Sequence, residues 1–473
     1  MSDLYGTRVL VMGLGVHGGG LGVARWLLRQ GARVTVTDMA HHAALAHSLA
    51  ALHETEVATG TAVRYVLGAH HEEDFRNHEL LVTNPAVRPD SPWIALARAA
   101  GVRIETEMTL FFRRCLGPIL GVTGTKGKTT TALLLGAMLR QVFPATVVAG
   151  NLRVSALEAL AQIDAQTPVV LELSSFQLGG LGEAALSPQW SLITNLSPDH
   201  INYHGSLHAY IEAKRQIVAH QQPGGVVVLP PELRTGPLGW AGSPPFIPAT
   251  AEVLTVAVDH AAADCVCDAD GQVHCRDTFL FREADVQLPG RHNLANALAA
   301  ATLAFRFGIP AAAIVQALHA IRGVEHRQEL IRILDGVRYI NDTTATNPAA
   351  ATVALTAVEP PIILLAGGAD KQLEFAPLAE AIATRVRVLI LLEGSATPRL
   401  QAALTTARAE NPTVEAPRIS GPFSDFAAAI AYARSIAQPG DVILLSPGCA
   451  SFGMFQNEFH RGDEFRRIVS ALA

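Results

Sequence analysis

Residues 121–130, Gly121-Val-Thr-Gly-Thr-Lys-Gly-Lys-Thr-Thr130, indicate both the fold and the chemistry of this chain. They follow a short apolar run at residues 118–120 and precede an apolar stretch at residues 132–139. This is the strand, loop and helix setting of a phosphate-binding loop. Glycines let successive N–H groups converge on phosphate oxygens, and the helix that follows directs its positive end at the same oxygens.

The loop is a variant of the strict nucleotide-binding pattern. Val122 stands where that pattern has its first glycine, so Gly121 and Gly124 are the earlier glycines here. Lys128 is placed to reach the β- and γ-phosphates, and Thr129 to give its hydroxyl to Mg²⁺. A glycine-rich turn with two chance lysines is the alternative, and the coincidence of strand, Gly-Lys-Thr and helix disfavours it.

Bulk composition limits the classes of protein to which the chain can belong. Its 473 residues are too many for one core and suggest two or three domains. A formal net charge of −6 without a basic cluster gives no sign of nucleic-acid binding. Five cysteines show no disulfide framework, and no apolar run is long enough to span a membrane. We therefore expect a soluble cytoplasmic protein.

The first residues form a βαβ opening. A β-rich run at residues 8–12 leads into a G-x-G-x-x-G turn at 13–18, and a second strand at 34–37 ends at Asp38. This pattern indicates a nucleotide or a dinucleotide near the first turn and does not say which. A nicotinamide-dependent oxidoreductase is therefore one alternative.

Polar residues interrupt two apolar runs after the phosphate loop. Glu172 lies inside the run at 169–173, where a carboxylate is costly unless it is paired, bound to a metal or on a solvent-exposed edge strand. The strand at 190–195 leads into a polar turn at 197–202, and the carboxyl ends of strands are where ligands gather in open α/β sheets. Residues 210–217 read as a helix with Tyr210 and Lys214 on one face.

Residues 222–290 look β-rich. Cys265, Cys267, His274 and Cys275 invite a zinc site, but their spacing fits no usual one, and a hairpin turning at 268–271 is favoured. Four apolar strands at 338–340, 362–366, 388–392 and 442–445 alternate with alanine-rich helices. That alternation predicts a parallel sheet covered on both faces.

Taken in order, these motifs resemble the Mur ligase family, the ATP-dependent amide-bond enzymes of bacterial peptidoglycan synthesis. The resemblance covers nearly the whole chain and is carried by residues 121–130, 172–177 (Glu-Leu-Ser-Ser-Phe-Gln), 195–200, 210–214, 292–296, 326–327, 341–347 and 446–451. It is closest to the branch that joins D-glutamate to UDP-N-acetylmuramoyl-L-alanine. The resemblance implies a monomer with small-molecule substrates.

The same resemblance implies an α/β fold of three domains. Residues 1–108 would be a Rossmann-like UDP-binding domain. Residues 109–323 would be an ATP-binding domain of the phosphate-loop ATPase type, with a parallel sheet and a small β-rich part. Residues 324–473 would be a Rossmann-like amino-acid-binding domain.

The implied chemistry is carboxylate activation. ATP phosphorylates the substrate carboxylate, and the amine of the amino acid then attacks the acyl phosphate. The first step brings two anions together, so Mg²⁺ and lysines should dominate the site. By resemblance, the catalytic residues are Lys128, Glu172, His200 and Lys214. Thr129 and Glu172 would hold one Mg²⁺, and His200 with a carbamylated Lys214 a second.

The resemblance also implies three binding sets. ATP would contact Gly124, Thr125, Lys126, Gly127, Lys128, Thr129, Thr130, Asn293, Asn296, Arg327 and Asp342. The UDP substrate would contact Gly13, Leu14, Gly15, Val16, Asp38, Asn84, Asn151, Ser174 and Gln177. The amino acid would contact Thr346, Lys371, Ser451 and Phe459.

Three positions depart from the family pattern. Thr344 stands where a lysine is frequent, Glu458 where an aromatic residue is expected, and Arg153 where a small apolar residue is usual. These changes spare the ATP chemistry and leave the amino-acid and muramoyl contacts open. L-glutamate, another acceptor, and a non-catalytic nucleotide-binding role therefore remain alternatives.

Overall fold

The computed structural model describes residues 3–15, 18–152, 155–234, 251–259, 262–321, 323–410 and 416–472. The chain divides into two compact units, residues 1–321 and 322–473. The first unit contains two sheets and the second contains one. No helix in the described ranges is long and apolar enough to cross a membrane.

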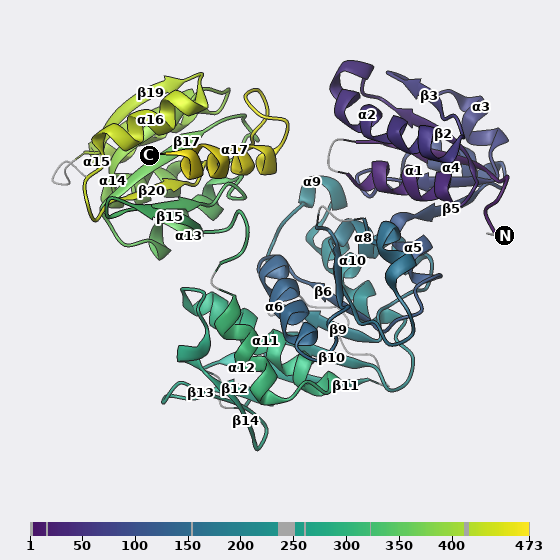
Figure 1. Ribbon diagram of the computed structural model, residues 1–473, viewed down its shortest axis with the longest axis horizontal. Helices are drawn as coiled ribbons and strands as arrows, with labels where there is room; N and C mark the ends of the chain where they lie inside the picture. Colours follow the sequence, from purple (N-terminus) through teal and green to yellow (C-terminus); the bar gives the residue numbers. More distant parts are fainter. Residues whose placement is uncertain are drawn as a thin grey trace. The chain divides into compact units, whose positions relative to one another are not determined.

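The first sheet of unit 1 is entirely parallel and has the strand order β3-β2-β1-β4-β5 (Figure 1). Its strands are β1 (Arg8–Met12), β2 (Arg33–Asp38), β3 (Arg64–Leu67), β4 (Leu80–Thr83) and β5 (Arg103–Thr106). The helices that follow them are α1 (Gly19–Arg29), α2 (His42–Thr59), α3 (Glu72–Asn77), α4 (Pro92–Ala99) and α5 (Glu107–Phe112). The sequence predicted β1, β2 and β4.

The second sheet of unit 1 has the order β14-β13-β12-β11-β10-β9-β6-β8-β7. It is parallel except for the hairpins at its β14 edge. Its strands are β6 (Ile119–Thr123), β7 (Val147–Gly150), β8 (Val169–Glu172), β9 (Trp190–Ile193), β10 (Val226–Leu229), β11 (Glu252–Val258), β12 (Cys265–Cys267), β13 (Gln272–Cys275) and β14 (Thr278–Arg282). Its helices are α6 (Lys128–Arg140), α7 (Ala156–Ala159), α8 (Ser175–Glu183), α9 (Ile201–His204), α10 (Leu207–Ala219), α11 (Arg291–Phe307) and α12 (Ala311–Ala320).

The predicted hairpin at 268–271 is confirmed by antiparallel β12 and β13. Cys265 and Cys275 face each other across this hairpin and form a disulfide, which the sequence analysis did not predict. Cys267 is a buried free thiol on the same strand as Cys265.

Unit 2 is a six-stranded sheet of order β15-β16-β20-β17-β18-β19, with only the β15 edge antiparallel. Its elements are β15 (Glu329–Leu334), β16 (Val337–Asn341), α13 (Pro348–Ala357), β17 (Ile362–Gly367), α14 (Ala376–Arg385), β18 (Val386–Leu392), α15 (Thr397–Glu410), β19 (Arg418–Phe423), α16 (Phe426–Ile436), β20 (Val442–Leu445) and α17 (Glu458–Ala471). Alternate residues of β17 enter separate apolar cores on the two faces, because a strand covered on both sides buries both of its side-chain rows. The predicted doubly covered parallel sheet is thereby confirmed.

One buried carboxyl group ties the two sheets of unit 1 together. Glu107 begins α5, directly after the last strand of the first sheet, and is 6% exposed. Its Oε1 accepts hydrogen bonds from the Ser155 hydroxyl (2.5 Å) and the Ala156 N–H (3.1 Å) at the start of α7. Ser155 also packs closely on α1, since a Cβ at Gly22 would lie 2.3 Å from the Ser155 Cβ.

Burial raises the pKa of Glu107 to about 7, despite the bonds from Ser155 and the α7 backbone. The folded protein therefore keeps a proton that the unfolded chain loses as pH rises from about 4.5 to 7, so this group makes folding less favourable over that window. Glu107→Gln keeps the acceptor oxygen without the charge. Between pH 5 and 8 we expect the unfolding free energy of the wild type to fall by roughly 2–3 kcal/mol more than that of this variant.

Urea melts of wild type and variant across this range measure the effect. Parallel pH curves for the two proteins would contradict the shifted titration.

Candidate active site

The phosphate-binding loop lies where the sequence predicted it, between α6 and the end of β6, a strand flanked by β9 and β8 in the nine-stranded sheet. Gly124 and Gly127 have φ of 148° and 82°, in the region that favours glycine. A Cβ at Gly124 would lie 1.9 Å from Thr194 Oγ1, and one at Gly127 would lie 2.4 Å from Asn296 Oδ1. The loop therefore has no room for side chains at either position.

Within the loop, some of the predicted ATP ligands already make hydrogen bonds to other parts of the protein. The Thr125 N–H donates to Asn195 O, and its hydroxyl joins Ser197 and Tyr210 at about 3 Å. Thr125 thus fixes the loop with both polar groups. Lys128 Nζ donates to Thr125 O at 3.1 Å, and Thr129 and Thr130 begin α6 beside it.

Lys126 is held differently. Its ammonium is mostly exposed and pairs with Asp199 at 3.5 Å. Asp199, which the sequence analysis did not assign a role, also accepts from the N–H of His200. Burial raises the pKa of Asp199, but the Lys126 ammonium and the hydrogen bonds from His200 N–H and Lys126 outweigh it, so the pKa is lowered overall.

Glu172 ends β8 beside β6 and is 2% exposed, so the edge-strand alternative is wrong. Its Oε1 accepts a hydrogen bond from Asn151 Nδ2 at 2.8 Å. Its Oε2 is fully buried and has no hydrogen-bond partner among the described residues. A buried carboxylate oxygen left in this way is costly, and a hard cation such as Mg²⁺ would satisfy it.

Lys214 of α10 is 2% exposed and lies directly beneath the loop. Its Nζ donates to Gly124 O at 2.7 Å and approaches Thr123 Oγ1 at 3.3 Å. Burial, and then the charge of Lys128, place the pKa of Lys214 well below its ordinary value. Spacing alone would suggest that Lys214 is an ordinary lysine on the helix surface, but the fold buries it.

His200 lies close enough to Lys128 and Lys214 for their charges to affect it. It precedes α9 with a left-handed φ of 50° and packs edge-on against the Phe176 ring at 5.0 Å. Burial lowers its pKa, and the charges of Lys128 and Lys214 add to the effect. A neutral imidazole is the form that binds a metal. The structure thus gathers Lys128, Glu172, His200 and Lys214 around one loop.

A cavity of about 340 Å³ adjoins the loop on the side of β11 and α11. Lys126, Gly127 and Asn296 line it, together with residues 256–258 of β11 and His292. Asn293 does not line the cavity, but its Oδ1 accepts from Asn296 Nδ2 at 3.3 Å. The sequence did not identify the β11 wall, because an apolar strand carries no sign of a ligand.

Four of the predicted UDP contacts follow or end strands β1, β2 and β4 at the carboxyl edge of the first sheet, namely Gly13, Gly15, Asp38 and Asn84. Asp38 Oδ2 accepts from the N–H of Gly15, which fixes the glycine turn, and Asn84 packs against Gly13. Leu14 is a core side chain with no exposed surface, and Val16 lies outside the described residues.

Two further predicted contacts already have a structural role. Ser174 and Gln177 form a reciprocal cap at the start of α8. That cap accounts for their spacing without a substrate.

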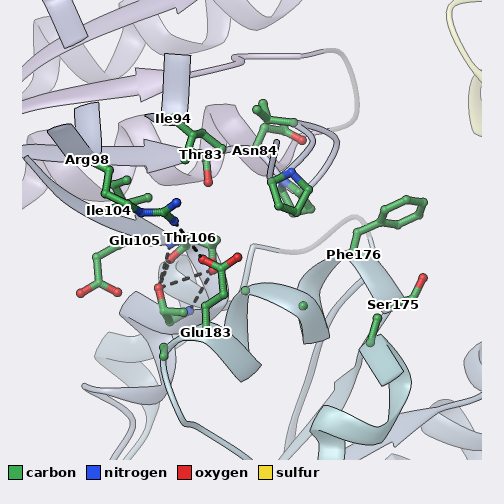
Figure 2. A pocket seen from close by; sticks show the side chains of 18 of the residues that line it. Thr83, Asn84, Ile94, Arg98, Ile104, Glu105, Thr106, Ser175, Phe176 and Glu183 are labelled. Carbon is green, nitrogen blue, oxygen red and sulfur yellow. Dashed lines mark hydrogen bonds and ion pairs between the residues drawn. The ribbon is translucent and has the colours of Figure 1, made fainter. Parts of the chain in front are cut away.

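Figure 2 shows a second cavity, of about 420 Å³, between the first sheet and α8. Arg98 and Glu183 pair across it at 3.5 Å. Of the predicted UDP contacts, Asn84 is in its described lining, beside Ser175 and Phe176. The other predicted UDP contacts that the structure describes are not part of this lining.

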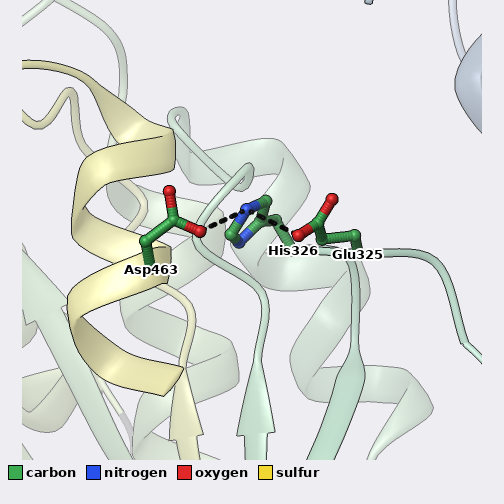
Figure 3. Close-up of side chains that lie close together, drawn as sticks. All are labelled: Glu325, His326 and Asp463. Carbon is green, nitrogen blue, oxygen red and sulfur yellow. Dashed lines mark ion pairs between the residues drawn. The ribbon is translucent and has the colours of Figure 1, made fainter. Parts of the chain in front are cut away.

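In unit 2, Arg327 occupies a tight turn between two residues with left-handed φ, His326 at 64° and Gln328 at 45°. His326 is buried, and its ring lies between Asp463 (3.3 Å) and Glu325 (3.7 Å) (Figure 3). Arg466 pairs with both carboxylates and with Glu329, so a guanidinium already supplies the cation of this cluster. We assign no metal there.

Asp342 supports the same turn. It accepts from the Gln328 N–H at 3.2 Å and from Ser446 Oγ at 2.7 Å, and burial raises its pKa to about 7. Thr344, the position without the expected lysine, donates its hydroxyl to His326 O at 2.9 Å. These bonds hold the turn that presents Arg327.

The predicted amino-acid contacts are partly brought together. Lys371 Nζ lies 3.1 Å from Thr346 Oγ1. Ser451 is buried in the segment that follows β20. Phe459 instead packs near His326, with ring centroids 5.8 Å apart. Arg461 is 1% exposed and donates to the backbone oxygens of Thr343 and Cys449, an anchor to which the sequence analysis gave no role.

Comparison with known proteins places this arrangement. Three family models match consecutive segments: a Mur ligase MurD-like N-terminal domain at residues 7–106, a Mur ligase middle domain at 122–304, and a Mur ligase glutamate ligase domain at 326–449. The chain belongs to the Mur ligase family.

Similar proteins include two UDP-N-acetylmuramoylalanine–D-glutamate ligases. That of Roseiflexus sp. (strain RS-1) is 54% identical over 99% of this chain and 100% of its own length. That of Symbiobacterium thermophilum is 35% identical over 98% of each chain.

Among solved structures, MurC of Thermotoga maritima matches with a TM-score of 0.62 and 20% identity, covering 98% of this chain and 100% of its own. MurF of the same organism, in complex with ADP, matches with a TM-score of 0.55 and 18% identity, covering 100% and 97%. These two likenesses support the fold.

Proposed function

We propose that this Mur ligase joins D-glutamate to UDP-N-acetylmuramoyl-L-alanine, consuming ATP and releasing ADP and phosphate. The full-length similarity to D-glutamate ligases supports the substrates. The observation that carries the chemistry is the unpartnered, buried oxygen of Glu172 beside a phosphate loop and a buried lysine. The nicotinamide alternative rested on the first glycine turn and Asp38, and the family assignment gives both another use.

The three domains take separate tasks in this proposal. Residues 1–108 bind the UDP part through Gly13, Gly15, Asp38 and Asn84. Residues 109–323 bind ATP, with Asn296 and the β11 wall around the base. Residues 324–473 supply Arg327 to the phosphates and Thr346, Lys371 and Ser451 to the amino acid. The chain acts as a monomer in the cytoplasm, where its nucleotide substrates are made.

The residues around the loop fit two Mg²⁺ ions. Thr129 and Glu172 would hold one, and His200 with a modified Lys214 the other. Bound there, Mg²⁺ would offset the negative charge that builds up when a carboxylate approaches the γ-phosphate. Lys128 orients the same phosphate, and the loop N–H groups of α6 add their positive end. The substrate carboxylate becomes an acyl phosphate, and the glutamate amine displaces phosphate from it.

Lys214 fits carbamylation because a buried amine with a lowered pKa is neutral enough to add to CO₂. Addition of the neutral amine to CO₂ forms an N–C bond, releases one proton and gives a carbamate anion. That anion relieves the repulsion from Lys128 and matches a metal beside His200. The unmodified ammonium donates to Gly124 O and cannot bind a cation.

The substrate assignment is tested by phosphate release. With UDP-N-acetylmuramoyl-L-alanine, ATP and Mg²⁺, we expect release to require an amino acid and to be at least about tenfold faster with D- than with L-glutamate. A malachite-green assay with the two enantiomers side by side measures this. Faster release with L-glutamate would reassign the substrate, and release independent of amino acids would contradict the ligase.

The two loop lysines should separate in function. Lys128→Ala is expected to lower kcat by about 10²–10³-fold, because its ammonium meets the charge that develops in transfer. Lys126→Ala is expected to raise the KM for ATP only a few-fold, since its exposed ammonium is shared with Asp199. Steady-state kinetics of the two variants give the comparison. Equal losses of kcat would remove the distinction, and an unaffected Lys128 variant would favour a passive nucleotide-binding role.

Carbamylation of Lys214 predicts a requirement for CO₂. Wild-type protein in ¹³C-bicarbonate should show a carbamate carbon resonance that Lys214→Met lacks, and activity should fall in CO₂-free buffer and return with bicarbonate. As pH falls, the amine gains a proton and the carbamate is lost, so both signals should decline together towards acid pH. Full activity without CO₂ would exclude the modification.

A further inference from the structure

Lys371, the proposed partner of the amino-acid carboxylate, lies on the loop that follows β17 of unit 2. The loop covers residues 368–375, and Lys371 Nζ meets Thr346 Oγ1 at its tip. A lysine side chain has four rotatable bonds, so its ammonium has a defined place only if the loop has one. The bonds that hold this loop therefore bear on amino-acid binding.

The first half of the loop is fixed by backbone contacts. Ala369 and Ala450 exchange hydrogen bonds of 2.9 and 3.2 Å, which joins the loop to the segment carrying Ser451. A Cβ at Gly368 would lie 2.3 Å from Ala450 O, and one at Gly394 would lie 2.2 Å from Gly368 O. Such close approach leaves this half no freedom to shift.

The second half of the loop depends on side chains. Gln372, next to Lys371, has a left-handed φ of 57°, which side-chain-bearing residues disfavour. Asp370 Oδ1 accepts the Gln372 N–H at 2.7 Å and stabilises this turn. The Asp370 N–H in turn donates to Ser395 Oγ at 3.0 Å. Lys371 thus sits inside a turn that Asp370 closes.

Arg399 of α15 clamps the turn from outside. Its Nη1 lies 2.9 Å from both carboxylate oxygens of Asp370, and its Nη2 donates to Leu373 O at 3.2 Å. The guanidinium also stacks at 5.7 Å from the Phe375 ring centroid. One side chain therefore binds the residues before and after Lys371, a geometry that a planar fork of donors allows and an ammonium does not.

We propose that Arg399, acting through Asp370, is a positioning residue that holds Lys371 in place and thereby sets the affinity for the amino-acid substrate. The proposal deepens the function proposed above and rests on it for the identity of that substrate. Loss of Arg399 leaves the backbone half of the loop intact and frees the turn around Lys371. The cost falls on amino-acid binding rather than on ATP or the UDP substrate.

The same sheet offers a matched control. Arg387 pairs with Asp441 at the amino-terminal edge of β18 and β20, the edge opposite the loops, and donates to Ile436 O. Its exposure is similar to that of Arg399, 38% against 44%, and its partner is more buried. Arg387→Ala thus removes an equivalent Arg–Asp pair without touching the loop that carries Lys371.

We expect Arg399→Ala to raise the KM for D-glutamate by about tenfold or more. The kcat should stay within about threefold, and the KM values for ATP and the UDP substrate should not change. The KM of Arg399→Lys for D-glutamate should lie between those of Arg399→Ala and the wild type, because an ammonium can replace only some of the hydrogen bonds that the guanidinium makes. Arg387→Ala should lower the melting temperature at least as much and leave all three KM values unaltered. A KM for D-glutamate that is the same in the Arg399 and Arg387 variants, or a fall in kcat alone, would overturn the proposal.

A second measurement needs no substrate. Acetic anhydride labelling of Lys371, followed by peptide mass spectrometry, should be several-fold faster in Arg399→Ala than in wild type or Arg387→Ala, because the ammonium leaves Thr346. Equal rates in the three proteins would sink the positioning role. A wild type that labels as expected but releases no glutamate-dependent phosphate would instead contradict the proposed function alone.

Discussion

The burial of charge beneath the phosphate loop is the constraint on which the site depends. Lys214 and Glu172 are both almost fully buried, and one carboxylate oxygen of Glu172 has no partner in the described chain. In a medium of low dielectric such groups cost several kcal/mol unless they are neutralised or paired. Burial, together with the charge of Lys128, lowers the pKa of Lys214, which is one expression of this cost. A cation bound to Glu172 and a carbamate formed on Lys214 would neutralise both buried groups. In the proposed function, the charges beneath the loop are therefore balanced only when ligands are bound.

The rest of unit 1 keeps that region rigid. The N–H and the hydroxyl of Thr125 form hydrogen bonds with Asn195, Ser197 and Tyr210, so the loop is bonded to the turn that carries His200. Asn151 binds Glu172 by side chain and backbone. Glu107 then bonds the start of α7, a few residues after Asn151, and so joins the first sheet of unit 1 to the second. Asn151 and Ser155 thus hold Glu172 and Glu107, respectively, by separate hydrogen bonds.

The sequence was sufficient for features that local pattern encodes. Continuous apolar runs gave β1, β4, β8 and β20, and the glycines of the phosphate loop gave its position. It was insufficient where partners lie far apart: Thr125 and Tyr210 are 85 residues apart, and Glu107 and Ser155 are 48 apart. It also could not separate two uses of one motif. Ser174 and Gln177 form a helix cap, whatever else they bind. Lys214 was recognised only through the family, because nothing in its spacing indicates burial.

The departures in unit 2 show how a lost charge is accompanied by added rigidity. At position 344, where a lysine is frequent in the family, Thr344 lies after β16 and donates its hydroxyl to His326 O. His326 is itself held by Asn341 and by two carboxylates that Arg466 neutralises. Arg327 therefore leaves a turn whose neighbours on both sides are fixed in left-handed conformations. The backbone that carries Arg327 is thus ordered without a ligand, and in the proposed function less of the binding energy would be spent on ordering it.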